Sequence, residues 1–205
     1  MNLLVVDLDG TITKSDNLIE FSYFMILKER RIRFLLVFPL LLLLKFKLIN
    51  NIRFKILYAF WIIKKIRVNY LKSCAEKFVS SESFRRVIND DVLKFINEQK
   101  DAKKIILSAN YSLIAENVAK LIKIETCLAI NLETKNGKYT GLISGLIPYG
   151  KEKIVVFSNF VNDNGYGKTI GIGDSKSDLS ILKHLDEGYL VSINKRTNMT
   201  TFLKV

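Results

Sequence analysis

The chain has 205 residues, of which 49% are hydrophobic, and carries a formal net charge of +12. This length suffices for one domain with a sizeable core and an insertion, and the apolar content excludes a disordered chain. The positive charge is concentrated: residues 14–77 hold 14 Lys and Arg against 4 Asp and Glu, whereas the rest holds 18 against 16. Because that charge is interleaved with leucines rather than with polar and stacking residues, we expect no nucleic-acid partner.

The N-terminal part predicts one strand followed by a helical insertion. Residues 3–8 (LLVVDL) are typical of a buried strand, because they are few, apolar and partly β-branched. A helix is expected to begin at Asn17, which has capping-box spacing to Glu20, and to run past residue 30. The helical, basic insertion then continues to about residue 80.

Two short apolar runs lie within this insertion, and each has a basic residue on both sides. FLLVFPLLLLL covers residues 34–44 and ILYAFWII covers residues 56–63. Both are shorter than the stretch of about 20 residues that spans a bilayer, and Pro39 is expected to kink the first. Two interpretations stay open: a helical pair on an anionic membrane surface, or two core helices with solvated lysines at their ends.

The remainder of the chain alternates between strands and helices. The predicted elements are an amphipathic helix at 81–100, a strand at 103–110, a helix at 111–122, a strand at 126–133 with a hairpin turn at Asn136–Gly137, a helix at 151–161, a strand at 168–174, a helix at 177–185 and a last strand at 188–194. This alternation predicts an α/β fold with a mostly parallel sheet and helices on both faces.

The two cysteines, Cys74 and Cys127, are far apart and lack metal-type spacing. They indicate a reduced compartment, and the N-terminus does not resemble a secretory signal. We therefore expect a cytoplasmic protein, with a peripheral place at the inner face of the cytoplasmic membrane if the insertion binds lipid.

Polar residues close three of the predicted apolar strands. Asp7 and Asp9 close the first, Ser108 the second and Asp174 a later one. Ligands bind at the carboxyl ends of the strands in such sheets, and residues i and i+2 of extended backbone point to one side. Two carboxylates placed together, with a third from another strand, predict a site for Mg²⁺ and phosphoryl chemistry.

Four segments together resemble the signatures of haloacid dehalogenase-type phosphatases. They are DLDGT (7–11), LSAN (107–110), GKEK (150–153) and GDSKSD (173–178), in the family's order. The segment between the first two resembles the helical C1-type cap of the phosphoserine-phosphatase-like branch, subfamily IB. The resemblance implies a Rossmann-like core formed by residues 1–14 and 81–205, with a cap at residues 15–80.

The resemblance also implies a Mg²⁺-dependent phosphomonoester hydrolase that forms an aspartyl phosphate. It implies Asp7 as the nucleophile and Asp9 as the group that protonates the leaving alcohol and then activates water. The other implied roles are phosphate binding by Gly10, Ser108, Ala109 and a lysine, and metal binding by Asp7, Asp9 (through its backbone carbonyl) and Asp174. Asp178 is implied either as a further metal ligand or as a group that supports the ligands.

The GKEK segment offers two lysines for this role. The positions four and seven after Lys153 are Phe157 and Phe160, which suit a buried helix face, whereas those after Lys151 include a serine. The pattern favours Lys153 and leaves Lys151 as the alternative.

The insertion bears on the substrate. Asp16 stands where phosphoserine phosphatases carry a Glu that binds the substrate amine, but it is one methylene shorter and can also cap the following helix. The leucine run with basic flanks resembles that of a membrane-associated member of the branch, phosphatidylglycerophosphate phosphatase C. The expected substrate is a small phosphorylated metabolite or a lipid phosphate, and an anionic membrane surface is a further candidate partner. The alternative function is a non-catalytic or regulatory membrane-surface binding module on the same scaffold.

Overall fold

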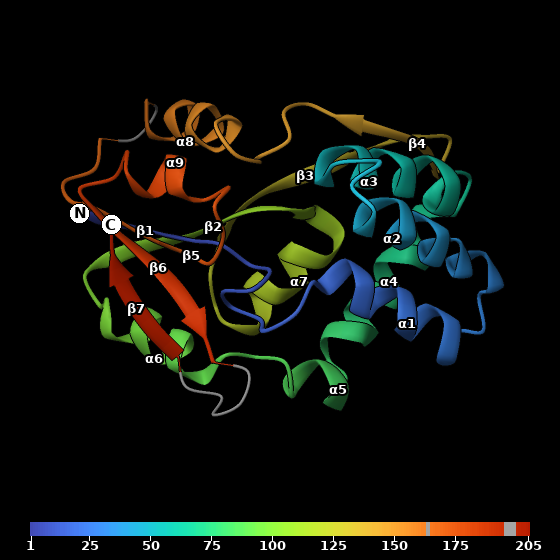
Figure 1. Ribbon diagram of the computed structural model, residues 1–205, viewed down its shortest axis with the longest axis horizontal. Helices are drawn as coiled ribbons and strands as arrows, with labels where there is room; N and C mark the ends of the chain where they lie inside the picture. Colours follow the sequence, from blue (N-terminus) through green and yellow to red (C-terminus); the bar gives the residue numbers. More distant parts are fainter. Residues whose placement is uncertain (163–164, 195–199) are drawn as a thin grey trace.

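The computed structural model describes residues 1–162, 165–194 and 200–205 (Figure 1). Its elements are β1 (Asn2–Val6), α1 (Asn17–Leu27), η1 (Ile32–Leu36), α2 (Val37–Lys45), α3 (Asn51–Tyr58), η2 (Ala59–Ile63), α4 (Val68–Val79), α5 (Glu82–Arg85), α6 (Asp90–Glu98), β2 (Ala102–Tyr111), α7 (Ser112–Leu121), β3 (Thr126–Lys135), β4 (Lys138–Ser144), α8 (Glu152–Asn162), β5 (Thr169–Gly173), α9 (Leu179–Leu182), β6 (Glu187–Ile193) and β7 (Thr200–Lys204). The predicted α/β fold is confirmed.

The strands form one seven-stranded sheet in the order β4-β3-β2-β1-β5-β6-β7. The five central strands are parallel, and β4 and β7 pair antiparallel at the two edges. Val6 at the end of β1 pairs with Ile106 of β2 on one side and with Ile172 of β5 on the other. The carboxyl ends of β1, β2 and β5 therefore meet at one edge of the sheet, where such folds bind ligands.

Alternating residues of β1 pack on opposite faces of the sheet, as the two-residue period of a strand requires. Leu3 and Val5 contact a cluster that includes Phe157 of α8, whereas Leu4 and Val6 belong to the larger cluster on the other face. The four side chains are almost fully buried. Helices on both faces thus explain why residues 3–6 of this strand are all apolar.

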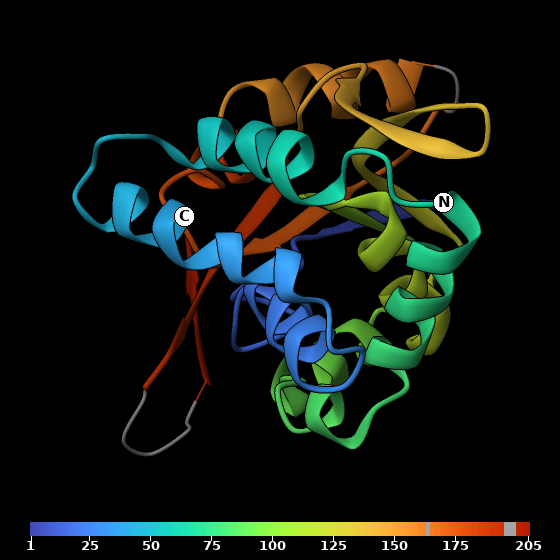
Figure 2. The same cartoon turned by 90° about the vertical axis from the view of Figure 1, so that its right-hand side faces the viewer.

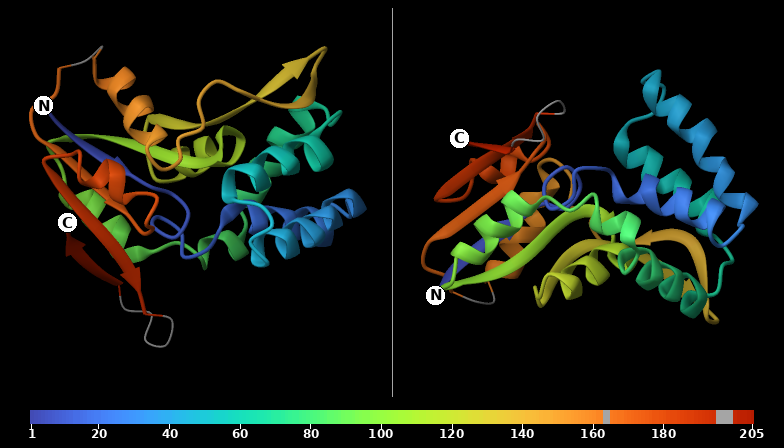
Figure 3. Two further views of the ribbon diagram at one scale, coloured as in Figure 1. Left: turned by 45° about the horizontal axis from the view of Figure 1, so that its top comes forward. Right: turned by 90° about the horizontal axis from the view of Figure 1, so that it is seen from below.

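The helices from α1 to α4 form a group beyond the carboxyl ends of the central strands (Figures 1 and 3). The β3–β4 hairpin extends to this group: the Lys65 amide donates to Tyr139 O at 2.8 Å, and the Tyr139 amide donates to Ile66 O at 3.0 Å. Its turn residues, Asn136 and Gly137, have φ values of 51° and 69°. These positive values fit the predicted two-residue turn.

The helix predicted at residues 81–100 is divided into α5 and α6, so this prediction is wrong in its continuity. Between them, Val87 O accepts from the Lys14 amide at 2.7 Å, and the Asn89 amide donates to Ile12 O at 2.9 Å. Because these backbone groups bind a distant segment, they do not continue the helical ladder. The amphipathic sequence pattern gave no indication of this break.

Three details of the N-terminal helices differ from expectation. Helix α1 ends at Leu27, before residue 30, and its N-cap is Asp16, whose Oδ1 accepts from the Leu18 amide at 2.9 Å. Pro39 does not kink α2, because it is the third residue of that helix, where backbone amides have no partner within the helix.

At the C-terminal end of the chain, β6 is not the last strand, since β7 pairs with it.

Within the described residues, we find no helix that combines the length and the apolar character needed to cross a bilayer.

Candidate active site

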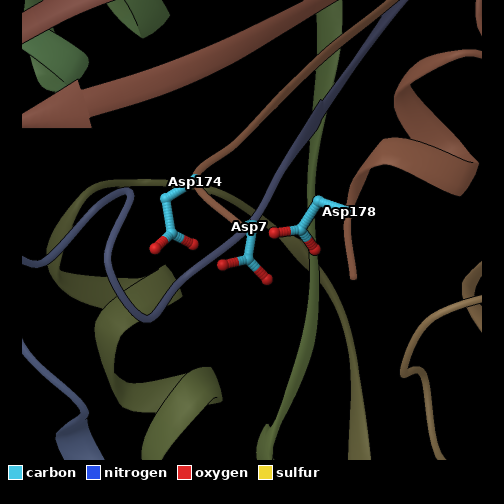
Figure 4. Close-up of side chains that lie close together, drawn as sticks. All are labelled: Asp7, Asp174 and Asp178. Atoms are coloured by element: carbon cyan, nitrogen blue, oxygen red, sulfur yellow. The ribbon is translucent and has the colours of Figure 1, made fainter. Parts of the chain in front are cut away.

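Three carboxylates meet where the central strands end. Asp7 follows β1, Asp174 follows β5 and Asp178 precedes α9. Each offers a carboxylate oxygen, and these oxygens lie within 4.8 Å of one another (Figure 4). We call Asp7, Asp174 and Asp178 the acidic cluster.

Lys153 of α8 reaches into this cluster. Its Nζ donates to Asp7 Oδ1 and to Asp178 Oδ1, each at 2.6 Å, and the residue is only 2% exposed. Phe157, one helical turn later, is also buried, whereas Lys151 is exposed. Of the two lysines that the sequence offered, the structure brings Lys153 to the site.

The charges of the cluster fit a divalent cation. When all three carboxylates are ionised, the Lys153 ammonium balances one of three negative charges and leaves a net charge of −2. Burial raises the pKa of Asp174 to about 6, and repulsion by Asp178 adds to this rise. Burial likewise raises the pKa of Asp7 well above its ordinary value, although Lys153 opposes it. Crowded carboxylate oxygens of this kind are the hard ligands that Mg²⁺ prefers.

Gly10 makes the close approach of Asp174 possible. Its φ is +81°, in the left-handed region, and a Cβ built at this position would lie 2.1 Å from Asp174 Oδ2. A side chain here would therefore displace a carboxylate of the cluster as well as strain the backbone. This is the physical reason for the glycine in DLDGT.

The side chain of Asp9 does not belong to the acidic cluster, in contrast to the expectation from i, i+2 spacing. Strand β1 ends at Val6, so extended geometry does not continue through Asp9. Its Oδ1 accepts from both the amide and the Nδ2 of Asn17 at 2.8 Å. Asn110 Nδ2 donates to Oδ1 at 3.0 Å and to Oδ2 at 2.9 Å. These donors hold the Asp9 carboxylate, and it is not one of the three that make up the acidic cluster.

The environment of Asp9 suits proton transfer. Burial raises its pKa to about 6, and the nearby Asp16 carboxylate acts in the same direction. A carboxyl group with a pKa near the working pH can both donate and accept a proton. Of the residues that hold it, Asn110 stands in the LSAN segment but received no role there, and Asn17 was expected only to begin a helix. Only their contact with Asp9 reveals it.

Ser108 lies in β2 at the same edge of the sheet. It is buried, and its Oγ accepts from the Asn110 amide at 3.1 Å. Strand β2 changes register against β3 between Leu107 and Tyr111. This irregularity begins just before Ser108, and bulges next to sites commonly redirect a side chain.

The residues of the site line one cavity of about 300 Å³. All the predicted site residues line it: Asp7, Asp9, Gly10, Asp16, Ser108, Ala109, Lys153, Asp174 and Asp178. The wall opposite the strand ends comes from the helical group and includes Leu44, Phe54 and Lys55. The family signatures gave no signal for this wall, because it is formed only when the insertion folds over the sheet.

Lys55 is a buried cation in that wall. Its Nζ lies 3.9 Å from Asp16 Oδ2, and its backbone carbonyl accepts a hydrogen bond from the buried Tyr111 hydroxyl. Because Tyr111 belongs to β2, this bond ties α3 to the strand that carries Ser108. Asp16 therefore both caps α1 and lines the cavity, as the two sequence interpretations allowed.

The family model of haloacid dehalogenase-like hydrolases matches residues 4–183. The chain belongs to this family. The match covers the strands and helices that hold the cluster, so the resemblance seen in the four signatures is confirmed, and this hydrolase has the expected Rossmann-like core.

Solved structures show the same fold. A protein of unknown function from Bordetella pertussis Tohama I is 16% identical, with a TM-score of 0.80 over 90% of this hydrolase and 86% of that chain. A family hydrolase from Salmonella enterica serovar Typhi is 13% identical, with a TM-score of 0.67 over 91% and 61%. A structure described as a phospho-aspartyl intermediate analogue of phosphoserine phosphatase is 17% identical, with a TM-score of 0.62 over 89% and 82%. No protein of curated function matches this hydrolase significantly in sequence.

Proposed function

We propose that this hydrolase is a Mg²⁺-dependent phosphomonoesterase that works through an aspartyl-phosphate intermediate. The observation that carries the proposal is the position of Asp7. Its carboxylate follows the central strand, contacts the Lys153 ammonium at 2.6 Å and faces the cavity. The fold shared with a phosphoserine phosphatase described with a phospho-aspartyl analogue supports the same chemistry.

In the proposed first step, a carboxylate oxygen of Asp7 attacks phosphorus while the bond from phosphorus to the ester oxygen breaks. Asp9 gives its proton to the departing oxygen, which leaves as an alcohol. Lys153 and the Ser108 hydroxyl, with the Ala109 amide, stabilise the negative charge on the transferring group. In the second step the oxygen of a water attacks the phosphorus of the aspartyl phosphate while Asp9 takes a proton from the water. The bond from phosphorus to the Asp7 oxygen breaks, which releases inorganic phosphate and restores the Asp7 carboxylate.

Mg²⁺ would be held by Asp7, Asp174 and the backbone carbonyl of Asp9, with Asp178 close by. Asp178 accepts from the Ser175 amide at 3.0 Å and from Lys153, so it is already well supplied with donors. When bound, the ion supplies charge neutralisation between an anionic nucleophile and an anionic ester.

The proposed division of the chain is a core at residues 1–14 and 81–205 and a cap at residues 15–80. The cap would select the substrate, because it contributes the outer wall of the cavity. Asp16 and Lys55 offer both signs of charge there, beside the apolar Leu44 and Phe54. These features suit a small phosphorylated metabolite or the head group of a lipid phosphate. The proposed location is the cytoplasm or, if the helical group binds lipid, the inner face of the cytoplasmic membrane.

The test is Asp7→Asn, which keeps the size of the nucleophile and removes its charge. Purified protein is assayed on a panel of phosphomonoesters that includes lipid phosphates, with Mg²⁺ or with a chelator. Turnover by the wild type should require Mg²⁺ and fall by about a thousandfold or more in the variant. Asp101→Asn, at an exposed aspartate outside the cavity, is the matched control and should keep wild-type turnover. Undiminished hydrolysis by Asp7→Asn would refute the covalent mechanism.

A further inference from the structure

Helix α2 is apolar both on the face that packs into the core and on the face exposed to solvent. Phe34, Val37 and Leu40 point into the core and are at most 1% exposed. Leu35 and Leu42, on the opposite side of the same helical stretch, are 42% and 55% exposed. A helix that needs only to cover a core carries polar residues on its outer face, so packing of the insertion accounts for half of this leucine run and leaves the other half unexplained.

The exposed apolar residues are continuous with those of the neighbouring helices. We define the outer helical surface as Leu35, Leu36, Phe38, Leu42, Phe46 and Trp61, all of them exposed. On one side, the Phe38 ring lies 6.0 Å from that of Tyr23 in α1. On the other side, Leu36 and Trp61 line one shallow hollow. Figure 2 shows α2 (light blue) in front, on the outside of the helical group.

Arg33 fixes η1 against the end of η2. It thereby holds Trp61 of η2 next to the residues of the outer helical surface that come from η1 and α2. Its Nε donates to Trp61 O and its Nη1 to Lys64 O, each at 2.7 Å. Both acceptors are neutral backbone carbonyls. Among the described residues, no carboxylate forms an ion pair with the Arg33 guanidinium. The surface is preformed and carries positive charge at its edge.

Basic residues far outnumber acidic ones in the segment that forms the surface. Residues 21–75 contain twelve Lys and Arg and a single acidic residue, Glu29. Glu29 is itself occupied, since its Oε1 accepts from Lys77 Nζ at 3.3 Å. Exposed aromatic and leucine side chains bordered by cations are the composition of a segment that lies in the headgroup region of an anionic bilayer.

We propose that the outer helical surface docks on anionic membranes, with Leu42, Phe46 and Trp61 entering the interface. A second copy of this chain fits less well, because two such surfaces would bring their cations together. A spanning mode is not part of the proposal, since the described helices are too short for it.

Docking would bring the active site to the lipid surface. Leu44 of α2 and Ile52 of α3 line the catalytic cavity, and the chain between these two helices carries Phe46. The residues that would enter the interface thus belong to the same short stretch as the cavity wall. This arrangement favours a phosphate ester that is itself held at a membrane.

The chain contains one tryptophan, Trp61, and it lies on the proposed surface at 40% exposure. Its fluorescence therefore reports docking directly. The full chain is mixed with vesicles of phosphatidylcholine alone or with about 30% phosphatidylglycerol. Binding is measured by co-sedimentation, and insertion by a blue shift and by quenching from brominated acyl chains. Neither readout uses hydrolysis, so failure of docking and failure of the proposed phosphatase activity remain distinguishable.

The key variant is Leu42→Ser with Phe46→Ser, and its matched control is Leu142→Ser, at a leucine of β4 that is also 55% exposed. We expect the wild type and the control to bind anionic vesicles, with quenching of Trp61 that persists at about 0.5 M salt. The affinity of the double variant for anionic vesicles should be lower by about tenfold or more, and its circular dichroism spectrum should be unchanged. Binding that vanishes in salt without quenching, absence of binding, or self-association that the double variant abolishes would each overturn the proposal.

Discussion

Replacement of Lys153 by methionine tests the electrostatic account of the site. The substitution keeps most of the side-chain length and removes an ammonium that contacts Asp7 Oδ1 and Asp178 Oδ1 at 2.6 Å in a buried setting. Loss of one partner of a buried ion pair costs about 3–5 kcal/mol. Because two carboxylates lose the same cation, we expect about 4–5 kcal/mol, which lowers Tm by about 8–20 °C in a domain of this size.

The assay is thermal unfolding at pH 7 without metal, followed by the same measurement with Mg²⁺. The net charge of the acidic cluster changes from −2 to −3 in the variant, so Mg²⁺ should recover part of the lost stability. Turnover should stay lower by about a hundredfold or more, because the cation that stabilises the transferring group is still missing. Lys151→Met is the matched control, since Lys151 is exposed two residues earlier.

A Tm for Lys153→Met within about 2 °C of the control would refute the argument that this pair is buried and unscreened. Equal losses of turnover in the two variants would refute the assignment of Lys153 to the transferring group. Stability should also depend on pH with a definite sign. Without the ammonium the carboxylates of Asp7 and Asp178 become easier to protonate, so the deficit of the variant should shrink as pH falls toward 4.

Two further predictions concern the metal. Gly10→Ala places a Cβ against Asp174, whereas the control Gly145→Ala changes a glycine with a similar φ of +77° and no atom within 4 Å of the added Cβ. Only Gly10→Ala should abolish the rise in Tm that we expect on addition of Mg²⁺. Equal effects of the two variants would refute the steric argument. Burial raises the pKa of Asp174 to about 6. If Mg²⁺ binds here as proposed, it binds the ionised carboxylate, so the rise in Tm should be large at pH 7.5 and small at pH 5; a rise independent of pH would contradict this.

The sequence by itself determined the succession of strands and helices and the order of the four signatures. Both depend on neighbours along the chain. An apolar, β-branched run such as residues 3–6 favours a strand wherever it is placed, and Asp7, Ser108 and Asp174 each follow or close such a run. Parallel topology then brings strand ends to one edge, which is why Asp7, Ser108 and Asp174 could be placed together before the structure was known. Apart from Asp9, the other site residues were named from the resemblance to the family.

Choices between faces and partners needed the tertiary structure. The division of the helix at residues 81–100 results from backbone bonds to Ile12 and Lys14, and the orientation of Asp9 results from Asn110, about a hundred residues away. No local pattern encodes either contact.

The leucine run shows the same limit in another form. An α2 helix that is apolar all round has no polar face to indicate which side packs on the core, so both sequence interpretations were consistent with it. Contacts of α2 with α3 and η1 decide that Val37 and Leu40 are buried and that Leu42 is exposed. Side-chain type sets what a residue gains from burial, but only the packed neighbours decide which of several equivalent residues is buried.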